Sequence, residues 1–155
     1  MKTLLRRGVM LSTLVAVCCF GLLIAINYNK THFTCNGNIV IHGNNVLLKA
    51  NVMYHFQGEE GNAKINGEVV YGNNQSTKLI QVFLFDFTRH GNTYYLKGTG
   101  ATPALGNMTD FEQLKKVMNY NFLSQGSEMP YTIISMGHQV YTISNGDLPL
   151  MYCSR

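Results

Sequence analysis

The hydrophobic pattern divides the chain into two parts. Residues 9–26 read VMLSTLVAVCCFGLLIAI and contain no charged side chain. From residue 33 onward, apolar and polar residues alternate, which is the period of a half-buried β-strand. In LKANVMYHFQ, the apolar residues from Leu48 to Phe56 share one face, and mostly polar residues share the other. The pattern predicts one apolar helix followed by a mainly β (α+β) domain.

The alternating segments predict an antiparallel β-meander of about seven strands. They start at residues 33–43, continue through successive hairpins from 48 to 98, and resume at residue 129. Runs rich in glycine and asparagine separate them, as hairpin turns do; these lie at 58–62, 72–76 and 90–92. A meander of this kind curls into a small or partial barrel, or into a strongly bent sheet.

One segment departs from the β pattern. Thr109 and Glu112 have the spacing of a capping box, with Thr109 at the N-cap and Glu112 at N3. Phe111 and Leu114 follow at helical spacing. The sequence therefore predicts one short helix over 110–119, packed against the sheet.

The apolar run from Val9 to Ile26 has three interpretations: a cleaved signal peptide, a lipoprotein anchor, or a helix that stays in the membrane. Signal peptidase requires small residues at positions −1 and −3 of its cleavage site. The candidate sites at residues 23–25 and 25–27 each fail at one of these positions. Cleavage is therefore disfavoured.

Lipidation is disfavoured as well. The modified cysteine of a lipoprotein follows a small residue, whereas Cys18 follows Val17 and Cys19 follows another cysteine. Eighteen helical residues rise about 27 Å, enough to cross a hydrocarbon core. We therefore predict an uncleaved signal anchor, which divides the chain into 1–8 (cytoplasmic stub), 9–26 (transmembrane) and 27–155 (exported β-rich domain).

The charges indicate an orientation. The net charge is +4, but Lys2, Arg6 and Arg7 precede the apolar run, which leaves nine Lys/Arg against eight Asp/Glu, about +1, for the rest. Basic residues stay on the cytoplasmic side, so the N-terminus is expected inside and the domain outside. The exported domain has no basic cluster for phosphates, which argues against direct nucleic-acid binding.

Two cysteines lie at opposite ends of the exported domain. In an oxidising compartment, Cys35 and Cys153 are readily interpreted as a disulfide that joins the first and last strands. The alternative is two unpaired, buried thiols.

No catalytic or metal-binding pattern is evident. The five histidines show no metal-ligand spacing; they are His32, His42, His55, His90 and His138. Asp86, within VFLFDFT, is either a buried acid with a raised pKa or a specific pairing partner, or, more simply, an end-of-strand residue bonded to a neighbouring turn. We predict a protein that is not an enzyme and holds no cofactor and no metal.

The sequence resembles a known family. FTCNG after the helix, NAKINGEV in a hairpin, TDFEQL in the predicted helix and DLPLMYC near the end are similar to the FidL-like membrane proteins of enteric bacteria. Such proteins are often encoded beside ToxR-type membrane-bound transcription regulators. The resemblance implies a single-pass protein of the bacterial inner membrane, with a periplasmic C-terminal domain that partners such a regulator.

Three functions are consistent with these features. The first is a non-enzymatic accessory protein that modulates a membrane-bound transcription regulator. The second is a periplasmic binding module for an apolar, bile-acid-like small molecule held in the barrel. The third is a surface-assembly or adhesin component, which is favoured only if the apolar run is cleaved.

Overall fold

The computed structural model describes residues 2–73, 75–103, 106, 109, 126–137, 139–146 and 148–154. The chain forms two compact units, Met1–His32 and Phe33–Arg155. The first contains the helix α1, and the second contains the strands.

α1 (Lys2–Thr31) is a single helix of 30 residues. It includes the predicted apolar run and continues past Ile26 to Thr31. Its segment Ser12–Thr31 is long and apolar enough to cross a membrane, since 20 residues rise about 30 Å. Large apolar side chains such as Phe20 and Leu23 are exposed within this unit.

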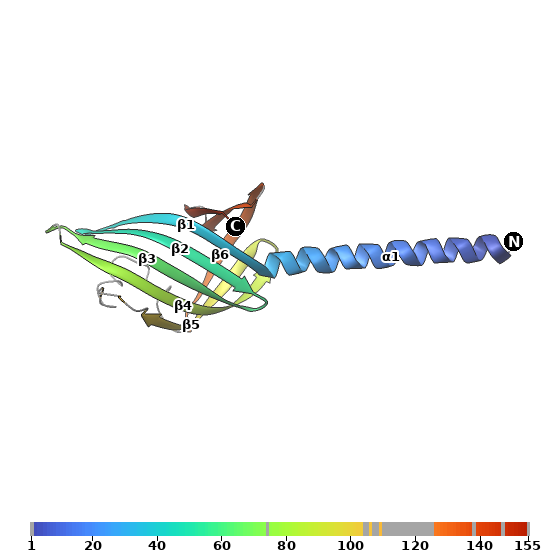
Figure 1. Cartoon of the computed structure of the whole chain (residues 1–155), viewed down its shortest axis with the longest axis horizontal. Coiled ribbons are helices and arrows are strands. Elements are labelled where there is room, and N and C mark those ends of the chain that lie inside the picture. The colour runs from blue at the N-terminus through green and yellow to red at the C-terminus, as the bar shows by residue number, and fades with distance from the viewer. Residues whose placement is uncertain are drawn as a thin grey trace. The chain divides into compact units, whose positions relative to one another are not determined.

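The second unit is an antiparallel barrel (Figure 1). Its strands follow one another around the barrel in sequence order: β1 (His32–Gly43), β2 (Val46–Gln57), β3 (Glu60–Tyr71), β4 (Ser76–His90), β5 (Thr93–Pro103), β6 (Glu128–Gly137), β7 (Val140–Asn145) and β8 (Leu148–Ser154). The mainly β prediction is confirmed. The prediction of a partial barrel of about seven strands is wrong, because eight strands form a closed barrel in which β1 pairs with β8.

The hairpins follow from local turn chemistry. Two-residue turns join β1 to β2, β2 to β3 and β4 to β5. Such turns need left-handed backbone, and Asn45 (φ 58°) and Gly91 (φ 64°) supply it. Each turn sets the register of its hairpin, so that Leu48 lies opposite Val69 and Tyr54 opposite Ala63. The alternation predicted from the sequence thus turns one face of every strand inward.

The inward face is filled by aromatic and branched side chains. Phe56 is 1% exposed and stacks on Phe33, with their ring centroids 4.5 Å apart. Phe87 and Tyr94 meet the same ring edge-on at 5.2 and 5.5 Å. This aromatic cluster joins β1, β2, β4 and β5.

The predicted helix over 110–119 lies outside the described residues. Thr109, its expected N-cap, is described and buried. Its hydroxyl donates to the carbonyl of Lys78 at 3.1 Å and lies 3.0 Å from the hydroxyl of Thr77. Thr109 therefore ties the chain after β5 to the start of β4.

Candidate ligand-binding site

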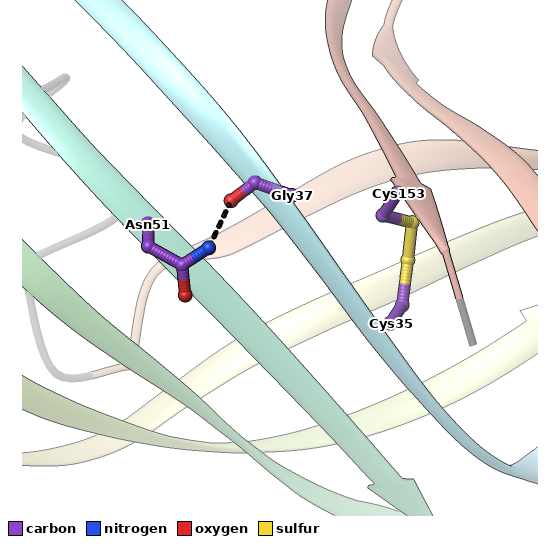
Figure 2. Close-up of a disulfide and its surroundings, with 4 residues drawn as sticks. All are labelled: Cys35, Gly37, Asn51 and Cys153. Atoms are coloured by element: carbon purple, nitrogen blue, oxygen red, sulfur yellow. Dashed lines mark hydrogen bonds between the residues drawn. A yellow bond between two sulfur atoms is a disulfide. The ribbon is translucent and has the colours of Figure 1, made fainter.

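The barrel is closed by a disulfide between its first and last strands. Cys35 of β1 is bonded to Cys153 of β8 across 118 residues of sequence, with their Cα atoms 5.3 Å apart (Figure 2). Both cysteines are buried. The predicted pairing is confirmed, whereas Cys18 and Cys19 are free and exposed in α1.

The β1–β8 seam is short. Its described ladder has two pairs, Asn36↔Ser154 and Gly37↔Cys153. At Gly37 the two strands lie very close together. A Cβ atom added to Gly37 would lie 3.3 Å from Cβ of Cys153 and closer still to two other atoms of β8. Asn51 of β2 donates to the carbonyl of Gly37 at 3.3 Å, which holds β1 at this crossing (Figure 2). Glycine, disulfide and asparagine thus meet where the barrel closes.

Beyond this crossing the two strands separate. Residues 38–43 of β1 and 148–152 of β8 form no ladder with each other, although all of them are described. A cavity of about 170 Å³ lies here and is partly open to solvent. Ile39 and Ile41 line it from β1, and Leu150 and Met151 line it from β8. The incomplete seam therefore gives access to the apolar interior.

Two tyrosines supply polar groups to this apolar cavity. Tyr54 of β2 and Tyr131 of β6 both line it and are both buried. Burial raises the pKa of Tyr54 well above its usual value, and the nearby Tyr131 raises it further. Burial likewise raises the pKa of Tyr131. Both phenols therefore stay protonated at neutral pH and keep their hydrogen-bond donors.

The two hydroxyl groups differ in their partners. The hydroxyl of Tyr131 donates to the sulfur of Met129 at 3.8 Å. The hydroxyl of Tyr54 makes no hydrogen bond with any residue that the structure describes, and its oxygen is not one of their fully enclosed, unpaired polar atoms. Tyr54 is nonetheless only 7% exposed. Tyr54 is therefore the cavity-lining group whose hydrogen-bonding capacity is unused.

The other chemical candidates lie elsewhere. Asp86 is exposed on the outer face of β4, between Glu60 of β3 and Lys97 of β5, so the interpretation as a buried acid is wrong. His55 is exposed on β2 as predicted, with its Nδ1 atom 2.9 Å from the hydroxyl of Thr34. Among the described residues, no cluster of His, Cys, Asp and Glu is arranged to hold a metal ion.

Sequence reasoning found the disulfide and raised a ligand cavity inside the barrel, but it did not locate that cavity or name its lining residues. The alternation in β2 places Tyr54 and Phe56 on the same inward face. Phe56 is packed among other rings, whereas Tyr54 lines the cavity. One signal was available in the sequence: a tyrosine is an unusual choice for an inward position unless its hydroxyl has a partner.

Comparison with known proteins adds no assignment: no protein-family model matches the chain, and no curated protein is significantly similar to it.

Proposed function

We propose that the protein is a non-enzymatic binding protein, anchored in the bacterial inner membrane by α1, whose periplasmic barrel takes up a small apolar molecule. The observation that carries this proposal is the cavity at the open part of the β1–β8 seam. Concave sites with apolar walls and few polar groups are typical of small-molecule binding sites. The retained apolar helix keeps such a barrel at the membrane surface, where apolar molecules concentrate.

The size of the cavity limits the guest. A cavity of about 150 Å³ in another protein accommodates benzene, and this one measures about 170 Å³. Drug-sized ligands occupy roughly 300–1,000 Å³. A guest of one ring or a short chain therefore fits inside, while a bile-acid-like molecule would insert one end only.

Methionine methyl groups provide the test. Met129 and Met151 line the cavity, whereas Met53 and Met136 are exposed outside it. Ethylbenzene added to the full-length chain in lipid nanodiscs is expected to shift the ¹³C-methyl signals of Met129 and Met151, because the bound ring alters their magnetic environment. The signals of Met53 and Met136 are the internal control. Equal shifts at all four methyl groups, or none at the two cavity methionines, would contradict the proposal.

A second candidate function is partnership with a ToxR-type membrane-bound regulator. It is favoured by an exposed apolar surface on β7 and β8, where Val140, Leu150 and Tyr152 are 41%, 48% and 63% exposed. Among the described residues of β6, β7 and β8, Glu128 alone is charged. Uncharged apolar surfaces of this kind commonly mark contacts with other proteins.

Site-specific crosslinking tests this candidate. A photoreactive residue at Tyr152, in cells that also produce the host's ToxR-type regulator, is expected to crosslink to that regulator. The matched control is the same residue at Lys49, which is exposed on β2 and does not belong to β7 or β8. Crosslinking from both positions, or from neither, would count against the partnership.

A further inference from the structure

The hydroxyl group of Tyr54 carries a more specific inference about the guest. A hydroxyl group that lines a cavity and has no protein acceptor can donate to a molecule that enters the cavity, and such a hydrogen bond contributes about 0.5–1.5 kcal/mol. Tyr54 is 7% exposed, lines the cavity, and has no hydrogen-bond partner among the described residues. The cavity therefore contains a donor suited to an incoming acceptor.

The second tyrosine of the cavity already has a hydrogen-bond acceptor. The hydroxyl of Tyr131 already donates to the sulfur of Met129. Of the two cavity phenols, Tyr54 is thus the one whose proton is available to a guest.

The walls of the cavity restrict the charge of the guest. Its described lining consists of apolar side chains, the two tyrosines and Asn145, and it includes no lysine, arginine or histidine. A carboxylate taken into such surroundings without a counter-ion would lose far more hydration free energy than one phenol can return. An uncharged oxygen needs only one hydrogen bond to be satisfied.

We infer that the cavity selects an uncharged molecule, of about one ring in size, whose carbonyl, ether or hydroxyl oxygen accepts a hydrogen bond from Tyr54. The apolar body of the guest contacts Ile39, Ile41 and Leu150 at the mouth and Ile143 within. This inference rests on the proposed binding function and names the class of ligand for that same site.

Two ligands of nearly equal shape test the inference. Acetophenone and ethylbenzene differ by a carbonyl in place of a methylene. Their dissociation constants are measured on the full-length chain in lipid nanodiscs, from the methyl signals of Met129 and Met151. Tyr54→Phe removes only the hydroxyl, and it is expected to weaken acetophenone binding about 3- to 10-fold, the effect of one hydrogen bond. Ethylbenzene binding is expected to stay the same or to tighten slightly.

Tyr71→Phe is the matched control. Tyr71 belongs to the same barrel, but its hydroxyl lies 3.2 Å from that of Thr77 and it does not line the cavity. This variant is expected to leave the affinity for both compounds unchanged. Benzoate, the charged relative, is expected to bind at least 10-fold more weakly than acetophenone.

The outcomes separate the two proposals. If Tyr54→Phe changes the affinity for both compounds equally, or for neither, Tyr54 does not recognise an acceptor and the inference is overturned, although the cavity still binds apolar molecules. Benzoate binding as tight as that of acetophenone would overturn the requirement for an uncharged guest. If no compound shifts the signals of Met129 and Met151, the binding function itself fails.

Discussion

Removal of the Cys35–Cys153 disulfide is expected to lower the free energy of unfolding of the barrel by about 4–5 kcal/mol. The bond closes a loop of 118 residues, and in the chain-entropy model a link across so long a loop strongly restricts the unfolded chain. The variant is Cys35→Ala/Cys153→Ala in the full-length chain. Urea unfolding is followed by near-ultraviolet circular dichroism of the buried tyrosines, since the chain has no tryptophan.

The helix cysteines provide a matched control. Cys18→Ala/Cys19→Ala also removes two sulfur atoms, but from exposed positions in α1, so the urea midpoint of the barrel is expected to remain unchanged. Without the disulfide, the two described ladder pairs remain to hold β8 against β1. Amide hydrogen exchange is therefore expected to accelerate most in β8. An unchanged midpoint in the Cys35→Ala/Cys153→Ala variant would show that the bond contributes little to stability.

Phe56→Ala is expected to destabilise the barrel by about 3–5 kcal/mol. The ring is 1% exposed and is shared by side chains from β1, β4 and β5; its neighbours include Phe33, Phe87 and Tyr94. Truncation removes these contacts and leaves a cavity. The surrounding strands cannot move in to fill it, because each is held by ladders on both sides. The same urea titration measures the loss.

Met53→Ala is the control for this variant. Met53 lies on the same strand, three residues earlier, but faces outward and is 40% exposed. Its truncation is expected to change the free energy of unfolding by no more than about 0.5 kcal/mol. If both variants lost a similar free energy of unfolding, the inward-facing side chains of β2 would contribute no more to stability than the outward-facing ones.

Much of the fold could be predicted because its signals are local. The period of two in residues 48–57 assigned Leu48 and Phe56 to the inward face, where both are buried. The glycine at 91 marked a hairpin turn, and the turn is present with φ 64°. In each case neighbouring residues alone determine the backbone, so the sequence pattern is sufficient.

The candidate site was less predictable because it depends on contacts between distant residues. Cys35 and Cys153 could be paired by their chemistry, which is specific. No comparable signal shows where the ladder between β1 and β8 ends, and residues of both strands beyond its last described pair, Gly37↔Cys153, line the cavity. The alternation turns Tyr54 inward, but only the tertiary structure places a cavity beside it.

The sequence by itself thus determined an apolar helix long enough for a membrane, a β domain of successive hairpins, and the two cysteines that join its ends. Only the tertiary structure decided that eight strands close into a barrel and that the closure is incomplete beyond Gly37. The physical reason is the range of the interactions. Alternation and turns are set within a few residues, whereas closure depends on strands more than a hundred residues apart, whose pairing competes with the entropy of a long loop.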